Sequence, residues 1–142
     1  TKALTDLLDV CPTSIGTISL PPPTTAAALE AIRQMRQNPQ LVQTLQANAR
    51  YLRSRLIEHE FEAIGETNVI PILLPEELSP KSFGRHLMEE HGLWVSPIWF
   101  IAKPRIRIVA NALHTKEEAD RLVAAMVATR NALYRPKTMV AT

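Results

Sequence analysis

Apolar residues recur every three or four positions along much of this chain, which is the spacing of one face of an α-helix. This spacing predicts four long helices, over residues 24–37, 39–59, 79–92 and 115–133. Thr115 and Glu118 have the spacing of a capping box at the start of the last helix. Gly92 is typical of the residue that ends a helix. A shorter apolar cluster predicts one more helix over residues 3–10.

Three shorter apolar stretches contain β-branched residues and predict strands, over residues 69–74, 93–100 and 105–110. Pro97 lies inside the second stretch and predicts an edge strand or a bulge, because proline has no amide hydrogen. Three consecutive prolines, residues 21–23, predict extended backbone. Strands that alternate with helices in this order predict an α+β fold, in which a small, mostly antiparallel sheet has helices on one face.

Composition and charge narrow the possible classes of function. The 142 residues, 46% of them hydrophobic and 21% charged, can form one sizeable core. A net charge of +2 without a basic run gives no indication of nucleic-acid binding. The longest apolar stretch is interrupted by Pro97, so no membrane span is expected. The single cysteine, Cys11, cannot form an internal disulfide, which favours a reducing compartment and a cytoplasmic protein.

Several common kinds of active site have no sequence pattern here. The chain contains no phosphate-binding glycine loop and no pair of cysteines. His86 and His91 are five residues apart on a predicted helix, which is the wrong spacing for one metal-binding face. Two adjacent pairs of glutamates, 76–77 and 89–90, lie at the ends of predicted elements and are expected to be solvated. We therefore expect no metal site.

Arg105 and Arg107 are the most informative candidate functional residues. They lie on the same face of a predicted strand, because side chains alternate along a strand. One interpretation is a solvated edge strand, or an arginine paired with an internal acid. The other is a carboxylate or phosphate site, since a guanidinium group matches a planar anion with two parallel hydrogen bonds.

Two further positions carry polar groups that can contact an anion. Thr17 and Ser19 in the stretch "TISLPP" place two hydroxyl groups on one face of an extended segment. This segment is either an ordinary linker or a set of donors for a phosphate group. His114 precedes the capping box, where a histidine most often orders the turn from strand to helix.

Two motifs resemble those of the α-oxoamine synthase family over roughly residues 2–133. The segment "TSIGTISLPPPTTAAALEAI" is similar to the family's "FTTSLPP" region. The segment "GLWVSPIWFIAKPRIRIVANALHTKEEADRLVAAM" is similar to its closing region, in which an R-x-R strand precedes "A-x-H-T-x-E-E-x-D". The resemblance implies the small C-terminal domain of a fold-type-I enzyme that depends on pyridoxal 5′-phosphate.

The resemblance also implies a reaction and roles for three residues. Such enzymes condense an amino acid with an acyl-CoA or acyl-carrier-protein thioester, lose carbon dioxide and release an α-aminoketone. Arg107 matches the arginine that binds the amino acid carboxylate. Thr17, and with it Ser19, matches the hydroxyl residues near the cofactor phosphate. The resemblance further implies a homodimer with the active site at the subunit interface.

The chain departs from the family pattern in two places. The family's cofactor-binding lysine lies further upstream than Lys2, which begins the segment "KALTDLLD". The chain is therefore expected to be the C-terminal portion of a longer enzyme, and this portion is expected to be inactive by itself. The loop before Arg105 is also shorter than the family's, which alters the edge of the pocket. We expect residues 1–23 to link from a larger cofactor-binding domain, 24–134 to form the C-terminal domain, and 135–142 to be a tail.

Two alternative functions stay open at this point. One is an aminotransferase or C–C lyase of the same fold that uses no thioester. The other is a non-catalytic module that binds a small carboxylate through Arg105 and Arg107.

Overall fold

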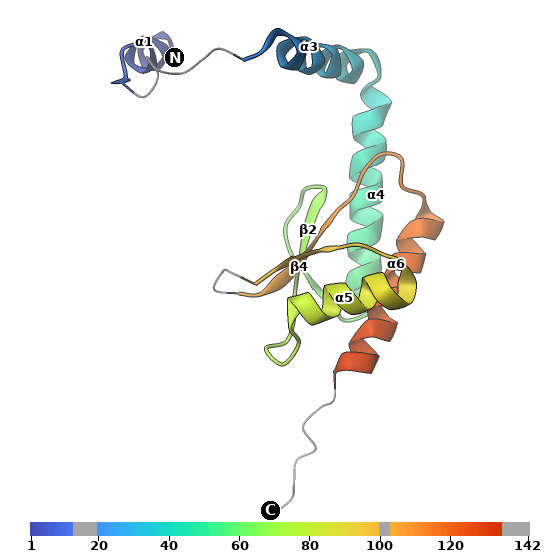
Figure 1. Ribbon diagram of the computed structural model, residues 1–142. Coiled ribbons are helices and arrows are strands. Elements are labelled where there is room, and N and C mark those ends of the chain that lie inside the picture. The colour runs from blue at the N-terminus through green and yellow to red at the C-terminus, as the bar shows by residue number, and fades with distance from the viewer. Residues whose placement is uncertain (13–19, 100–102, 135–142) are drawn as a thin grey trace, which may run out of the picture. The chain divides into compact units, whose positions relative to one another are not determined.

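The computed structural model (Figure 1) describes residues 1–12, 20–99 and 103–134 of the chain. Contacts divide the chain into two compact units, Thr1–Asn38 and Pro39–Thr142. Each unit is described by itself below. The domain limits expected from the sequence, with a boundary after residue 23, stay a prediction.

The described residues of the first unit form the helices α1 (Lys2–Asp9) and α3 (Pro22–Gln37), and neither helix contains a buried residue. Both helices were predicted, but the expectation of extended backbone throughout the proline run was wrong. Pro21 is extended, whereas α3 already begins at Pro22. The first turn of a helix has amide groups without helical partners, so a missing amide hydrogen costs nothing there.

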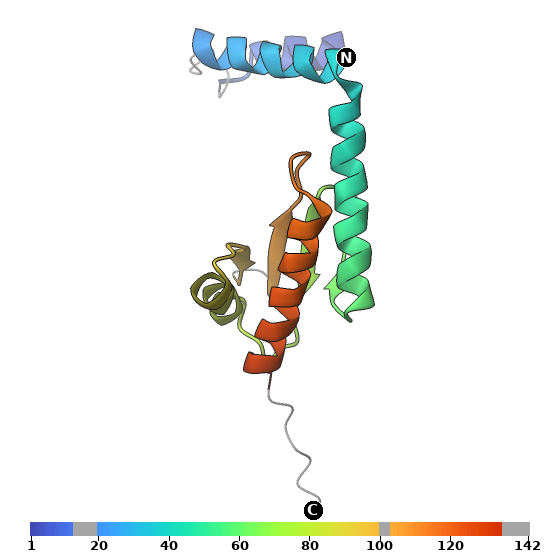
Figure 2. The ribbon, with the colours of Figure 1, turned by 90° about the vertical axis from the view of Figure 1, so that its right-hand side faces the viewer.

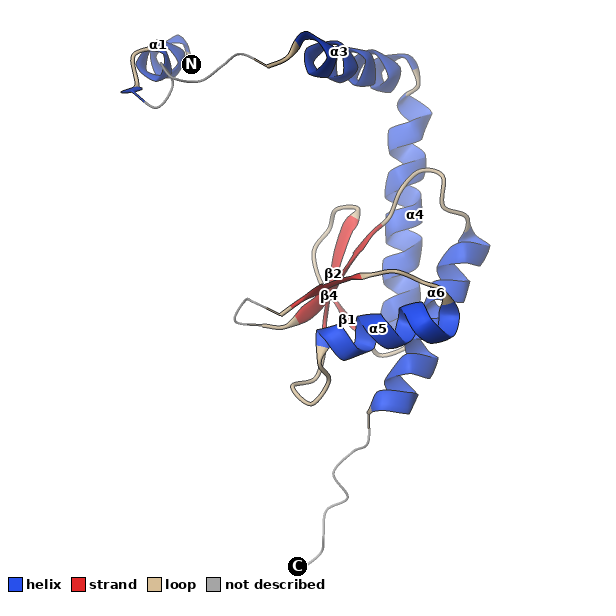
Figure 3. Ribbon diagram, in the orientation of Figure 1, coloured by secondary structure: helices blue, strands red, loops and turns tan. Residues whose placement is uncertain are grey.

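The second unit contains a four-stranded antiparallel sheet with strand order β1-β2-β4-β3. Its strands are β1 (Glu62–Ala63), β2 (Val69–Leu73), β3 (Ser96–Ile98) and β4 (Arg105–Val109). Figure 3 shows the strands in red. The strands β2, β3 and β4 lie within the predicted stretches, and β3 is an edge strand, as Pro97 predicts. The two-residue strand β1 was not predicted.

Three helices cover one face of this sheet: α4 (Pro39–Glu58), α5 (Pro80–His91) and α6 (Lys116–Leu133). Figure 2 shows α6 in front of the strands, with α4 to one side and α5 to the other. The predicted capping box begins α6. The side chains of Thr115 and Glu118 each accept a hydrogen bond from the backbone N–H of the other residue. Gly92 ends α5 in the left-handed conformation, with φ of 65°.

The core lies between this face and the helices. Alternate residues of the two central strands, Ile70 and Ile72 of β2 and Ile106 and Ile108 of β4, point into it and are buried. Full burial of one such side chain contributes about 1.5–3 kcal/mol. These observations confirm the α+β fold with an antiparallel sheet and helices on one face.

The other face of the sheet is here called the open face. It carries the intervening residues of the central strands, which are Val69, Pro71, Leu73, Arg105, Arg107 and Val109. Within the second unit, no described helix packs on this face. None of the helices formed by the described residues is long and apolar enough to span a bilayer.

Candidate functional site

Arg107 lies in the middle of β4, with its side chain on the open face. Its neighbours in the strand, Ile106 and Ile108, are buried on the helix face, whereas Arg107 is exposed. The same alternation that fixes the two isoleucines in the core therefore presents the guanidinium group to the open side.

The guanidinium group of Arg107 has one hydrogen-bond partner among the described residues, the hydroxyl group of Ser96. Nη2 of Arg107 donates to Oγ of Ser96 at 3.4 Å. The two residues are direct partners in the antiparallel pairing of β3 with β4. No described carboxylate forms an ion pair with Arg107. Most donors of this cation are therefore available to an anion from outside the unit.

Arg105 is arranged differently, although it lies on the same face. Its Nε donates to the backbone carbonyl oxygen of Lys103 at 3.1 Å, so the side chain turns back toward its own loop. Arg105 is half-buried and pairs across the sheet with Ile98, which has no polar side chain. Arg107 is therefore the better placed of the two arginines to bind a carboxylate.

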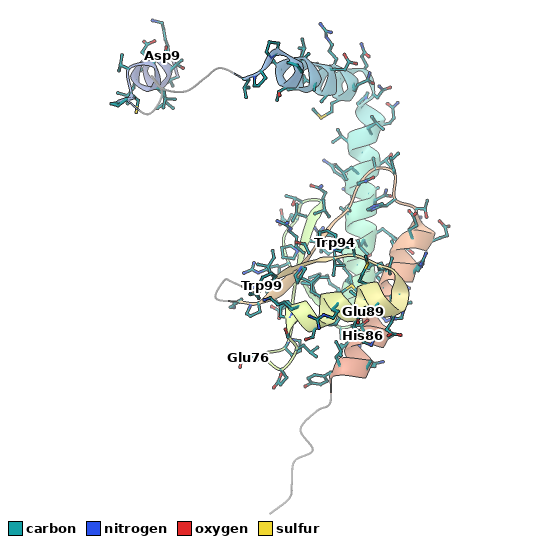
Figure 4. The ribbon with its side chains drawn as sticks, viewed as in Figure 1. Asp9, Glu76, His86, Glu89, Trp94 and Trp99 are labelled. Atoms are coloured by element: carbon teal, nitrogen blue, oxygen red, sulfur yellow. The ribbon has the colours of Figure 1, made fainter. Side chains whose placement is uncertain are left out.

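A pocket of about 430 Å³ lies beside Arg107, at the end of the sheet. Its walls come from β3, β4, α4 and α6, and apolar side chains such as Leu52, Val95 and Leu122 line most of it. Trp94 also lines it and is 74% exposed. Figure 4 labels Trp94 and Trp99, which precede and follow β3. The lining also includes the cations Arg107, Lys116 and Arg121 and the carboxylate of Glu118. A pocket with mostly apolar walls and an excess of cations suits a ligand with an apolar part and an anionic end.

The turn from β4 to α6 forms part of the pocket wall. The side-chain amide of Asn48, on α4, donates to the carbonyl oxygens of Asn111 at 3.1 Å and of His114 at 2.7 Å. The ring Nδ1 of His114 accepts from the backbone N–H of Asn111 at 3.3 Å. His114 therefore orders this turn, as expected for a histidine before a helix.

A cluster of charged groups joins α4 to α6 near the pocket. Both carboxylate oxygens of Asp120 accept from the hydroxyl group of Tyr51, at 3.0 and 2.9 Å, and one accepts from Nε of Arg55 at 2.9 Å. The bond from Arg55, followed by that from Tyr51, lowers the pKa of Asp120 below its ordinary value. Donation to Asp120 in turn raises the pKa of Tyr51.

The remaining candidates from the sequence have separate outcomes. Thr17 and Ser19 lie outside the described residues, so their role near a phosphate stays a prediction. Nδ1 of His86, on α5, lies 3.2 Å from Oγ1 of the buried Thr129. Within the described part of the chain, no three His, Cys, Asp or Glu side chains are grouped as a metal site requires.

The residues at this site that were not identified from the sequence include Asn48, Trp94 and Ser96. Asn48 is one of several polar residues on α4 and is 63 positions from the first carbonyl group that it contacts. Ser96 could have been found by pairing the predicted strands, because residues opposite each other in neighbouring strands share a face. The sequence alone does not fix the register that this requires.

Comparisons with known proteins agree with this architecture. The sequence model of the family described as aminotransferase class I and II matches residues 4–126. The 8-amino-7-oxononanoate synthase of Petrotoga mobilis (strain DSM 10674 / SJ95) is 38% identical over 107 residues, which are 72% of this chain and 27% of that protein. The chain thus spans about a quarter of the length of the curated relatives that it matches.

Solved structures give the same result for the fold. Serine palmitoyltransferase of Sphingomonas wittichii matches 92% of this chain with a TM-score of 0.77 and 21% identity, over 34% of its own length. The 8-amino-7-oxononanoate synthase of Francisella tularensis matches 93% of this chain with a TM-score of 0.77 and 17% identity, over 40% of its own length. At these identities, the likeness establishes the fold.

Proposed function

The chain belongs to the aminotransferase class I and II family, and we propose that it works as part of a longer acyltransferase that depends on pyridoxal 5′-phosphate. The reaction condenses an amino acid with an acyl thioester. A bond forms between the amino acid α-carbon and the acyl carbonyl carbon, the C–S bond breaks, and the amino acid carboxylate leaves as carbon dioxide. The products are an α-aminoketone and a free thiol. The names of the relatives, which include 8-amino-7-oxononanoate synthase, support this proposal.

The observation that carries the proposal is the state of Arg107. This arginine is exposed on the open face, borders the pocket, and has no carboxylate partner among the described residues. A cation in this state fits the carboxylate of an amino acid, which a guanidinium group binds through two parallel hydrogen bonds. The described residues thus fit the amino acid that such a cofactor holds.

Arg107 contributes orientation. Pyridoxal 5′-phosphate, when bound, supplies the electron sink that stabilises a carbanion at the amino acid α-carbon. Arg107 fixes the carboxylate and thereby fixes which bond of the α-carbon is aligned to break. Such positioning contributes several kcal/mol to lowering a barrier.

The same proposal extends to the parts of the site that are not described. Thr17 and Ser19 bind the cofactor phosphate of the neighbouring subunit in a homodimer. The lysine that binds the cofactor lies outside this chain, so the 142 residues alone are inactive. The single cysteine favours a cytoplasmic location.

The test is to express the complete reading frame and to measure thiol release from acyl thioesters in the presence of single amino acids. We expect Arg107→Ala to raise the KM for the amino acid roughly ten- to a hundredfold, since hydrogen bonds between charged groups contribute about 1.5–3 kcal/mol. The KM for the acyl thioester should stay unchanged. Arg107→Lys is the control that keeps the charge but loses the two parallel hydrogen bonds.

Three results would each contradict the proposal or a part of it. Amino-group transfer without thiol release would instead favour an aminotransferase. An unchanged KM for the amino acid in Arg107→Ala would remove Arg107 from the site. A cofactor that binds covalently to the 142-residue chain alone would show that the lysine is not elsewhere.

A further inference from the structure

We propose that Ser96 is a positioning residue, which orients the Arg107 guanidinium group toward the amino acid carboxylate. The inference rests on the proposed role of Arg107 and adds to it a residue that neither the sequence motifs nor the comparisons assign. Ser96 acts through Arg107, so its effect is on carboxylate binding.

The first argument is the chemistry of the contact. Oγ of Ser96 accepts from Nη2 of Arg107 and restrains a long side chain that is otherwise exposed. Ordering such a side chain costs conformational entropy, and a partner that is present before binding reduces this cost. A carboxylate in the same place would neutralise the cation and compete with the ligand. A hydroxyl group restrains the guanidinium group and leaves its charge intact, and its own hydrogen can still be donated.

The second argument is a difference between the two positions of β3 on the open face. Ser96 lies opposite Arg107, and Ile98 lies opposite Arg105. Arg105 has no polar partner across the strand and bonds to the carbonyl oxygen of Lys103 in its own loop. The arginine with a hydroxyl group opposite is therefore held on the sheet, whereas the arginine opposite an isoleucine turns away.

The third argument is that Ser96 itself stands on a fixed element. The next residue, Pro97, lies on the helix face, where its ring packs over Gly84 of α5 and would be 3.6–3.8 Å from a Cβ atom added at that glycine. Trp99, two residues further on, lies under the ammonium group of Lys81 at 4.0 Å. Contacts with α5 thus hold Pro97 and Trp99, and the alternation along the strand directs Ser96 to the open face.

The experiment uses the complete enzyme with its cofactor and calorimetric titration in the absence of acyl thioester. The probes are glycine, L-alanine and L-serine. The amino acid that binds most tightly is compared with its amide, which has no carboxylate. We expect Ser96→Ala to weaken binding of the amino acid about three- to tenfold and to leave the amide unchanged, because loss of one hydrogen bond to a charged group has an effect of this size.

Matched variants separate positioning from a general effect on structure. Ser96→Thr keeps the hydroxyl group and should restore binding to within about twofold. Ile98→Ala changes the equivalent position opposite Arg105 and should leave the affinity unchanged. In kinetics, Ser96→Ala should raise the KM for the amino acid and leave kcat unchanged. In the Arg107→Ala background, Ser96→Ala should have no further effect.

The outcomes distinguish the two proposals. If Arg107→Ala weakens binding but Ser96→Ala does not, or if Ser96→Ala weakens the amide equally, the positioning role is wrong and the proposed function stands. If none of the three amino acids binds, or if Arg107→Ala binds them like the unaltered enzyme, the proposed function fails and Ser96 loses its role with it.

Discussion

Alternate residues of one strand, β4, meet two different environments. On the helix face, Ile106 and Ile108 are buried at 0% and 7% exposure against three helices. On the open face, Arg105 and Arg107 meet no described helix of the same unit. Four consecutive residues thus divide between holding the fold and presenting cations, and a substitution can address either role without the other.

A second contrast concerns two arginines, Arg55 and Arg107. Arg55, at the contact of α4 with α6, bonds to the carboxylates of Glu58 and Asp120. The hydrogen bond to Asp120, followed by that to Glu58, raises the pKa of Arg55 above its ordinary value. Arg107 bonds to a hydroxyl group alone among the described residues. An arginine already paired with acids stabilises the fold, whereas one without an acid is available for a ligand.

The largest expected effect tests the helix face. We expect Ile106→Ala to lower the free energy of unfolding by about 3 kcal/mol, because it leaves a cavity among fully buried side chains. Chemical denaturation monitored by circular dichroism measures this change. The adjacent control, Arg107→Ala, should stay within about 0.5 kcal/mol of the unaltered protein. Equal losses in the two variants would show that the two faces do not divide the roles.

A smaller effect tests the two kinds of arginine. We expect Arg55→Ala to lower the Tm by a few degrees, because Asp120 then loses a hydrogen bond from a charged donor at the contact of α4 with α6. Arg105→Ala removes a cation that bonds to one backbone carbonyl group, and its Tm should stay unchanged. Calorimetric unfolding of both variants decides this, and a larger loss in Arg105→Ala would contradict the contrast.

The smallest effect is a dependence on pH. The pKa of Asp120 is lower in the folded protein than in the unfolded chain, chiefly because Arg55 donates to it. Its contribution to stability is therefore complete above the unfolded pKa, about 3.9, and is lost as the pH falls through the folded pKa. The difference in stability between the unaltered protein and Asp120→Asn should be constant from about pH 5 to 7 and shrink below about pH 4.

A difference that persists undiminished to about pH 2 would mean that the charge on Asp120 is not what joins α4 to α6. Asp120→Glu is a suitable control, because it keeps the carboxylate and changes only its reach.

Local patterns were sufficient to predict most of the elements. The capping box at Thr115 and the alternation in β4 depend on residues close in sequence, and both are observed. The proline run predicts extended backbone, whereas α3 begins at Pro22, because proline is compatible with a first helical turn. The strand β1 has two residues, which is too short for any periodicity.

The candidate site was predictable only in part. Arg105 and Arg107 stand out together because charged residues in an otherwise apolar strand are unusual, and the family resemblance singles out Arg107. The pocket beside Arg107 was not predicted, since its walls come from four elements and depend on packing. The bond between Tyr51 and Asp120 joins residues 69 positions apart, and nothing in the local sequence of either residue indicates the other.

The two outer strands of the sheet are very short, with two residues in β1 and three in β3. In β3 the central residue is Pro97, which has no amide hydrogen to offer to an incoming strand. An edge of this kind is a poor template for addition of a strand from another molecule. The sheet can therefore keep a partly apolar surface beside Arg107, on which no described helix of the same unit packs, with little tendency to aggregate through its edges.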